Sequence, residues 1–246
     1  MTEAPKYGQF GNLSGLYDTV RPPMPEIVLD YLLSNISMDS KVLDIGCGTG
    51  IVTRQLKNHG LKVIGSDIDT EMIDVARAYN DRAEYVVAPS EQLPFGDDVF
   101  DVVTCFSAFH WFANKEAVSE IKRVTVSGGT LFIANREYNS FKEMFLRALG
   151  PFIEESFFSV KRDYNPKTIL ETHEYNNIQE KSFVSRESLS AKEAVSYVQS
   201  TSLWNLVPDI KKVRAEEVLL VHFKSISIEE RTLRYGEIRT VLASAK

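Results

Sequence analysis

The sequence predicts a doubly wound α/β fold built on a mainly parallel β-sheet. Three observations support this prediction. Short apolar runs alternate with helical patterns over the first 135 residues, a glycine-rich loop follows the first apolar run, and an acidic residue ends the second. Such alternation is typical of right-handed crossovers in a parallel sheet. The chain has 246 residues, of which 43% are hydrophobic, and we expect residues 1–246 to form a single domain.

Five apolar runs in the first half are expected as strands. They are Lys41–Asp44, Lys62–Ser66, Glu84–Val87, Phe100–Cys105 and Thr130–Ala134. The expected helices have apolar residues on one face at helical spacing. They are Glu26–Asn35, Ile51–His59, Thr70–Tyr79 and Asn114–Val124.

The pattern changes after residue 136. Phe141, Phe145 and Leu149 are spaced four apart and predict a helix that ends at Gly150-Pro151, whereas residues 151–177 are expected to be irregular. We interpret 136–177 as an insertion after strand five that covers a substrate pocket, with aromatic side chains forming an apolar roof or part of the core. These aromatic residues include Phe141, Phe145, Phe152, Phe157 and Phe158.

The remaining segments are interpreted from local patterns. Ser190 and Glu193 have the spacing of a capping box, which predicts the start of a helix that runs to Gln199. The other expected elements are a strand at Ile178–Ser185, a helix at Asp209–Lys224 and two extended pieces within Ile228–Ser244.

Composition argues against several classes of protein. The formal net charge of −6 does not favour a broad surface for nucleic-acid phosphates, and no run approaches the roughly 18 apolar residues of a membrane span. The first ten residues are polar, so we expect a soluble, cytoplasmic protein. Cys47 and Cys105 are 58 positions apart and have no partner at metal-ligand spacing, so no metal site is expected.

The strongest signal is the glycine loop in Val42–Gly50, which reads Val-Leu-Asp-Ile-Gly-Cys-Gly-Thr-Gly. Glycines permit positive φ and let the backbone approach a ligand closely. Open α/β sheets bind ligands at the carboxyl ends of their strands, where this loop is expected to lie. Asp67 follows Gly46 by 21 residues and ends the second predicted strand, which suits a carboxylate that binds a ribose diol.

The spacing of the glycines separates this loop from related ones. In the dinucleotide fingerprint the third glycine would stand at Ile51, whereas here it stands at Gly50. Asp44, two positions before the first glycine, suits a ligand with a cationic amino-acid end and would repel a pyrophosphate. A P-loop is excluded because no Gly-Lys-Ser/Thr follows.

At Asp44–Gly50 the sequence resembles the class I S-adenosylmethionine-dependent methyltransferases, in particular the small-molecule group called type 11. Further segments resemble the later motifs of that family in order, although Thr125 replaces a commoner leucine. These segments are Asp67–Asp69, Ala88–Phe95, Phe100–Val103 and Arg123-Val124 with Gly128-Gly129. The resemblance covers residues 15–135 well and the remainder loosely. It implies a seven-stranded Rossmann-like methyltransferase fold with a helical or irregular insertion after strand five.

The resemblance also implies where S-adenosylmethionine binds and S-adenosylhomocysteine is left as product. Asp44 and the glycines would surround the methionine moiety, Asp67 would bind the ribose, and Ser90 and Glu91 would approach the adenine. The full set of cofactor-binding residues expected is Tyr17, Arg21, Asp44, Gly46, Cys47, Gly48, Asp67, Ile68, Ser90, Glu91 and Phe106.

Two further segments, Tyr17–Pro22 and Phe109–Phe112, occur together in a subset similar to trans-aconitate methyltransferase. In that subset Tyr17 and Arg21 would line the carboxylate end of the cofactor. We expect the substrate pocket to be formed by Tyr17–Arg21, Phe109–Trp111 and the insertion 136–177.

His110 follows strand four, where the sulfonium methyl should point. It is the candidate catalytic residue, as a base or a substrate ligand, and the alternative is a histidine that hydrogen-bonds the backbone beneath Trp111. Trp111 and Arg136 are candidate substrate residues, with packing and a solvated surface as the respective alternatives.

The predicted function is methyl transfer to a small-molecule acceptor, with a carboxylate and a hydroxyl both open. An NAD-dependent oxidoreductase is disfavoured by the loop spacing and by the lack of a Tyr-x-x-x-Lys pair. A DNA amino-methyltransferase would need an Asn/Asp-Pro-Pro-Tyr/Phe motif where this chain has Ser107–His110. A protein or RNA methyltransferase, and a cofactor-binding protein without turnover, stay open. No nucleic-acid or membrane partner is expected, and the oligomeric state is open.

Overall fold

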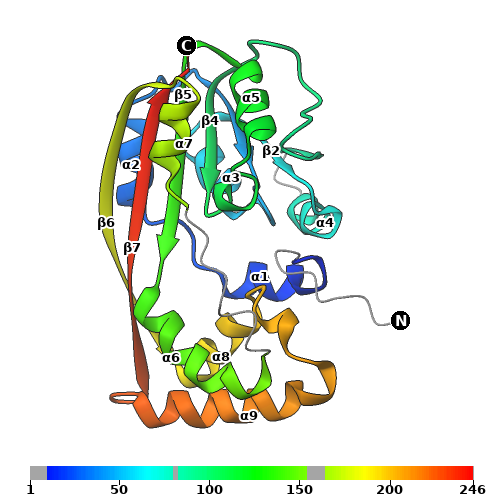
Figure 1. Ribbon diagram of the computed structural model, residues 1–246, viewed down its shortest axis with the longest axis vertical. Helices are drawn as coiled ribbons and strands as arrows, with labels where there is room; N and C mark the ends of the chain where they lie inside the picture. Colours follow the sequence, from blue (N-terminus) through cyan, green and yellow to red (C-terminus); the bar gives the residue numbers. More distant parts are fainter. Residues whose placement is uncertain (1–9, 80–82, 154–163, 246) are drawn as a thin grey trace. The chain divides into compact units, whose positions relative to one another are not determined.

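A seven-stranded sheet with the order β3-β2-β1-β4-β5-β7-β6 runs through the protein. The computed structural model describes residues 10–79, 83–153 and 164–245 (Figure 1). The strands are β1 (Lys41–Ile45), β2 (Lys62–Asp67), β3 (Glu84–Val87), β4 (Phe100–Phe106), β5 (Thr125–Glu137), β6 (Asn176–Ser190) and β7 (Arg231–Ser244). The prediction of a doubly wound α/β fold on a seven-stranded sheet is confirmed.

The sheet is parallel over its first five positions. β1 pairs in parallel with both β2 and β4, β2 pairs with β3, and β4 pairs with β5. β7 runs the other way, because the residue after its end, Ala245, exchanges hydrogen bonds with the start of β5: Gly128 N donates to Ala245 O at 2.9 Å and Ala245 N donates to Gly129 O at 2.8 Å. The chain order reverses between β1 and β4, and ligands bind at such a switch point, at the carboxyl ends of the strands.

Side-chain caps set the starts of several of the helices. Asp69 accepts hydrogen bonds from two backbone N–H groups of α4, Asn114 accepts one at the start of α5, and the capping box of Ser190 and Glu193 is confirmed at α8. The described α-helices are α1 (Ser14–Val20), α2 (Glu26–Leu33), α3 (Ile51–Asn58), α4 (Thr70–Ala78), α5 (Lys115–Val124), α6 (Asn139–Leu149), α7 (Pro166–Thr172), α8 (Ala191–Gln199) and α9 (Asp209–Ile226). The described 3₁₀ turns are η1 (Gly11–Leu13), η2 (Phe109–Trp111), η3 (Gly150–Phe152) and η5 (Trp204–Leu206).

None of the helices in the described ranges combines the length and the apolar character that crossing a bilayer requires.

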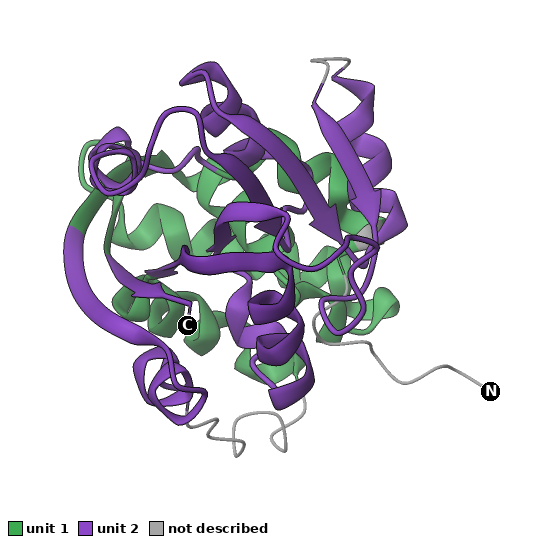
Figure 2. Ribbon diagram, turned by 90° about the horizontal axis from the view of Figure 1, so that it is seen from above, with its two compact units in different colours: residues 1–21, 137–163, 184–237 green, residues 22–136, 164–183, 238–246 purple. Residues whose placement is uncertain are grey.

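The chain divides into two compact units (Figure 2). Unit 1 consists of residues 1–21, 137–163 and 184–237, and unit 2 of residues 22–136, 164–183 and 238–246. Unit 2 contains the glycine loop, with apolar side chains clustered around β1 and β4. Unit 1 has a core of its own, in which Phe141 stacks on Phe223 with ring centroids 5.5 Å apart.

The expected insertion 136–177 is therefore shared between the units. Phe141, Phe145 and Phe152 pack in or against the core of unit 1, whereas α7 belongs to unit 2. Phe157 and Phe158 lie outside the described residues. The role of the insertion as a substrate cover stays a prediction.

Several element boundaries differ from the sequence predictions, among them those of β5, which extends beyond 130–134 at both ends. α7 lies in a stretch expected to be irregular, and its start is set by Asn165, which caps Thr168 N, followed by a proline in the first turn. β6 extends beyond 178–185 at both ends. β7 is one strand and not two pieces, because Gly236 allows close approach: a Cβ there would lie 2.3 Å from the ring of Tyr138.

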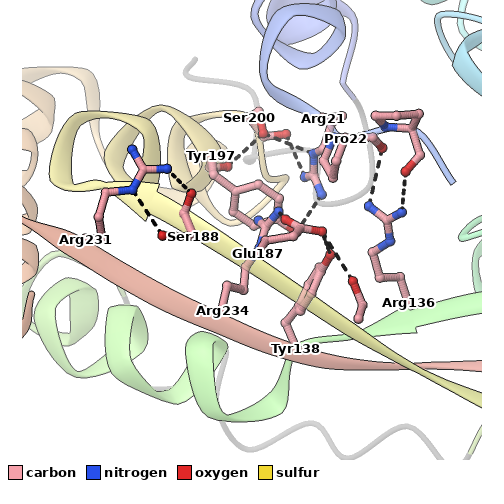
Figure 3. A network of polar contacts seen from close by, with 12 residues as sticks. Arg21, Pro22, Arg136, Tyr138, Glu187, Ser188, Tyr197, Ser200, Arg231 and Arg234 are labelled. Atoms are coloured by element: carbon pink, nitrogen blue, oxygen red, sulfur yellow. Dashed lines mark hydrogen bonds and ion pairs between the residues drawn. The ribbon is translucent and has the colours of Figure 1, made fainter. Parts of the chain in front are cut away.

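A buried arginine links β7 to β6 within unit 1 (Figure 3). Arg234 is 1% exposed and forms an ion pair with Glu187. Its guanidinium lies 3.8 Å from the ring centroid of Tyr197 and 4.3 Å from that of Tyr138, and the Tyr138 hydroxyl donates to Glu187 at 2.5 Å. A buried charge needs such partners, because its desolvation is otherwise uncompensated.

Replacing this arginine should destabilise the protein far more than replacing an exposed one. Arg234→Ala removes the charge that compensates Glu187 and should lower the free energy of unfolding by about 3–5 kcal/mol. The matched control is Arg231→Ala on the same strand. It loses an exposed ion pair with Glu193 and exposed hydrogen bonds to Ser188, and should change the free energy of unfolding by about 0–1 kcal/mol. Urea denaturation measures both, and equal losses would show that the Arg234 network is not a stabilising element.

Candidate functional site

The glycine loop after β1 uses its glycines in two ways. Gly46, Gly48 and Gly50 have φ values of +70°, +55° and +77°, which other residues rarely adopt. A Cβ on Gly46 would lie 2.4 Å from Ala108 Cβ, and one on Gly50 would lie 2.6 Å from the Tyr85 hydroxyl. In the described part of the chain, apart from Gly48 and its two neighbours, no heavy atom lies within 4 Å of a Cβ on Gly48. Gly46 and Gly50 therefore allow chain packing, whereas Gly48 faces open space where a ligand can approach the backbone.

Asp67, the last residue of β2, faces this loop. Its Oδ2 accepts a hydrogen bond from Gly48 N at 2.8 Å, and its Oδ1 accepts one from Asp69 N at 2.9 Å. Burial raises the pKa of the Asp67 carboxyl, while these backbone hydrogen bonds act to lower it. Each oxygen keeps a further lone pair for a ligand hydroxyl. The neighbouring Ile68 is 70% exposed, so an acceptor for a diol and an apolar surface lie side by side.

The loop after β3 supplies the next pair of predicted residues. Ser90 is buried and donates to Glu91 at 3.1 Å, and Asn114 Nδ2 donates to the other oxygen of Glu91 at 2.8 Å. The hydrogen bond from Asn114 lowers the pKa of Glu91. Asn114 therefore orients Glu91 while also capping α5, and neither role was predicted from the sequence.

Asp44 lies in β1, two residues before the first glycine of the loop, and is 1% exposed. Its Oδ2 accepts from the Thr53 hydroxyl at 2.6 Å and its Oδ1 accepts from the Thr104 hydroxyl at 2.9 Å. Burial raises the pKa of Asp44 from 3.8 to about 6, although both hydroxyls act to lower it. Neither threonine was predicted from the sequence. A contact between Asp44 and the amino-acid end of a cofactor stays a prediction.

The raised pKa of Asp44 makes the stability of the ligand-free protein depend on pH. Between pH 3.8 and about 6 the folded state binds this proton more strongly than the unfolded state, so stability falls as pH rises through this window. Asp44→Asn keeps hydrogen-bonding groups for Thr53 and Thr104 and carries no charge. At pH 7.5 the variant should exceed the wild type in free energy of unfolding by about 2–3 kcal/mol, and the difference should shrink toward pH 4.

Urea denaturation across this pH range checks the expectation, with Asp101→Asn as control. Asp101 is an exposed carboxylate that accepts from Lys41 N, and its replacement should show no such trend. A difference between Asp44→Asn and wild type that does not vary with pH would contradict the raised pKa.

The segment after β4 carries the candidate catalytic histidine. Phe106 is buried against Phe132, with ring centroids 5.8 Å apart, so its side chain contributes to the core. His110 is exposed in η2, with its ring centroid 4.6 Å from Trp111 and 6.0 Å from Tyr164. An exposed imidazole at the carboxyl end of β4 can exchange a proton with solvent. The catalytic role of His110, the cofactor contact of Phe106 and the substrate contact of Trp111 stay predictions.

Arg136, at the end of β5, holds the backbone ahead of α2 (Figure 3). Its two terminal nitrogens donate to Pro22 O at 3.3 Å and to Pro23 O at 2.7 Å. The observed contacts of Arg136 are thus with the chain itself, and a contact with substrate stays a prediction.

Tyr17 and Arg21 belong to unit 1, whereas the other predicted cofactor-binding residues belong to unit 2. The guanidinium of Arg21 donates to the Tyr197 hydroxyl at 2.8 Å and to Ser200 Oγ at 3.1 Å, and it lies 4.8 Å from the ring centroid of Tyr17. Within unit 1, Arg21 thus contacts Tyr197 in α8, the C-cap residue Ser200 and the ring of Tyr17. Their contact with a cofactor stays a prediction.

Comparison with known proteins agrees with the geometry of unit 2. Residues 43–133 match the family model described as a methyltransferase domain. An uncharacterized methyltransferase of Mycobacterium tuberculosis is 36% identical over 122 residues, which cover 50% of this chain and 49% of the relative. A malonyl-[acyl-carrier protein] O-methyltransferase of Buchnera aphidicola is 30% identical over 158 residues, 61% of this chain and 63% of that protein. The chain thus spans about half the length of the first of these relatives.

A solved structure extends the likeness in fold. Phosphoethanolamine N-methyltransferase 2 of Haemonchus contortus, in complex with S-adenosyl-L-methionine, superposes with a TM-score of 0.57 at 19% identity, covering 95% of this chain and 57% of that one. The sheet order and the loop at Gly46–Gly50 agree with the methyltransferase fold that these matches indicate. Residues 43–133 are thus similar to a methyltransferase domain, and the solved structure of similar fold binds S-adenosylmethionine.

Proposed function

We propose that this protein transfers the methyl group of S-adenosylmethionine to a small-molecule acceptor by in-line displacement. The observation that carries the proposal is the pairing of open space over Gly48 with the Asp67 carboxylate, which retains acceptor capacity for a ribose diol. The exposed Ile68 provides an apolar surface beside it for the adenosine.

The residues of this chain bind and orient the cofactor. Asp67 accepts the ribose hydroxyls, Ser90 and Glu91 approach the adenine, and the backbone at Gly46–Gly48 surrounds the methionine moiety. When bound, S-adenosylmethionine supplies a sulfonium-activated methyl group that needs no further activation. The protein has to align the acceptor with the methyl and sulfur atoms and to exclude water. A carboxylate acceptor needs no base, whereas a hydroxyl acceptor is helped by one.

A small-molecule acceptor is supported by the relatives and by charge. One relative is a malonyl-[acyl-carrier protein] O-methyltransferase, and the solved structure of similar fold is a phosphoethanolamine N-methyltransferase. The net charge of −6 does not favour a nucleic-acid substrate. We further propose membership of the subset similar to trans-aconitate methyltransferase, on the segments Tyr17–Pro22 and Phe109–Phe112, and a cytoplasmic location.

Cofactor binding and turnover test the proposal together. In calorimetry S-adenosylmethionine should bind and NAD should not. With methyl-labelled cofactor and a metabolite extract, the protein should form a labelled small product. Asp67→Ala should weaken cofactor binding at least about tenfold, because charge-assisted hydrogen bonds contribute about 1.5–3 kcal/mol. Asp74→Ala, which changes an exposed carboxylate on α4, is the control and should leave binding unchanged. NAD binding at equal affinity would contradict the proposed function.

His110 is proposed as the base or substrate ligand of the same reaction. His110→Ala should then lower turnover by about two orders of magnitude while cofactor affinity is retained. Steady-state kinetics and calorimetry on the same preparation separate these effects. Unchanged turnover would assign His110 to structure and leave catalysis to alignment alone.

A further inference from the structure

Asn135 is a buried amide at the carboxyl end of β5 that the proposed mechanism does not use. It lies one residue past Ala134, whose partner on β4 is Phe106, the last residue of that strand. Side chains alternate between the two faces of a strand, so Asn135 lies on the same face of β5 as Ile133. Phe109 packs on that face, in the same apolar cluster as Ile133. Asn135 therefore lies at the edge of the sheet from which the His110 segment leaves β4.

Among the described residues, only the Nδ2 end of this amide has a hydrogen-bond partner. Asn135 is 8% exposed, and its Nδ2 donates to the Tyr164 hydroxyl at 2.9 Å. Within the ranges that the structure describes, no group donates a hydrogen bond to the buried Oδ1. Buried polar atoms are nearly always hydrogen-bonded, and leaving one without a partner costs free energy. A bound molecule that donates a hydrogen bond would remove this cost.

The surroundings of Asn135 connect it to the cofactor loop. Its partner Tyr164 lies against His110, with ring centroids 6.0 Å apart. The same segment after β4 contacts the glycine loop, since Ala108 lies where a Cβ on Gly46 would be. That segment begins at Ser107, a non-glycine residue with φ of +53°, a conformation that costs free energy and is common at functional sites. Among the described residues of unit 2, the buried hydroxyls of Thr49, Ser66 and Tyr175 also have no partner. Thr49 lies in the glycine loop, the Ser66 backbone carbonyl accepts hydrogen bonds from that loop, and Tyr175 packs in the apolar core.

We propose that Asn135 positions the methyl acceptor by accepting a hydrogen bond from the nucleophilic group itself, which is a hydroxyl or an amine. The inference rests on the proposed function and narrows its substrate class, because an ionised carboxylate has no hydrogen to donate to Oδ1. As the new O–C or N–C bond forms, the C–S bond breaks and sulfur keeps its electron pair. The acceptor's proton leaves to His110 and from there to water. The amide oxygen of Asn135 takes no proton, so Asn135 is a positioning residue.

The chemistry of the product tests the substrate class without any variant. Protein incubated with methyl-labelled S-adenosylmethionine and a metabolite extract should give a product whose label survives mild alkali, with mass spectrometry placing the methyl on oxygen or nitrogen. Release of labelled methanol would identify a methyl ester and overturn the inference while leaving the proposed function intact, and a C-methylated product would do the same. No labelled product, with the cofactor bound, would overturn the proposed function and the inference with it.

Variants at Asn135 test the positioning role with the acceptor identified in this way. Asn135→Leu should raise the acceptor KM at least about tenfold and leave the S-adenosylmethionine Kd within about twofold. Asn135→Asp retains an oxygen at this place and should keep the acceptor KM within about threefold of wild type. Asn58→Leu, an exposed asparagine in α3, is the matched control and should change neither.

Two results would overturn the positioning role. An unchanged acceptor KM in Asn135→Leu would mean that Oδ1 faces only a buried water. Equal increases in acceptor KM and cofactor Kd, in both Asn135→Leu and Asn135→Asp, would mean that the amide only supports the fold through Tyr164.

Discussion

The site depends on the attachment of the glycine loop to the end of β2. The backbone N–H groups of Gly46 and Cys47 donate to Ser66 O at 2.7 and 3.1 Å, and the next one, of Gly48, donates to the Asp67 carboxylate at 2.8 Å. Three successive donors thus bind to two successive residues of the neighbouring strand. Gly46 and Gly48 have left-handed backbone in this arrangement, and the hydrogen bond from Gly48 N holds the Asp67 carboxylate beside Gly48.

Asp44, which precedes this loop in β1, is a buried carboxylate whose desolvation costs free energy. Asp44 is removed from solvent, and its partners are neutral hydroxyl groups and not a cation, so burial dominates its pKa. Thr104 stands opposite Asp44 on β4, and Thr53 lies in the helix that the loop leads into. The carboxylate therefore links β1, β4 and α3 at the point where the sheet reverses its strand order. A residue that lowers stability yet joins three elements under the loop is consistent with a functional constraint on that position.

The elements that sequence predicted well are those specified by local pattern. The strands β1–β4, the helices α2–α5 and the loop with Asp67 follow from apolar periodicity and glycine spacing, which are properties of adjacent residues. The partners of the site residues are tertiary: Thr104 is found from strand register, and Asn135 is an ordinary strand residue until Tyr164 is placed beside it. The division into two units was hidden for the same reason, because unit 1 is assembled from three separate stretches of the chain.

The buried polar groups near the site differ in how many of their acceptor atoms already have a hydrogen-bond donor within the protein. This difference distinguishes residues that stabilise the fold from residues that can bind a ligand. Both oxygens of Asp44 are occupied by hydroxyls of the protein, so this carboxylate can hold the fold without any ligand. Asp67 is intermediate, since each oxygen accepts one backbone hydrogen bond and can accept another. Asn135 is at the other extreme, with an amide oxygen that has no donor in the described protein. An unsatisfied buried acceptor lowers stability. A hydrogen bond from a bound ligand should therefore stabilise the protein least at Asp44, more at Asp67 and most at Asn135.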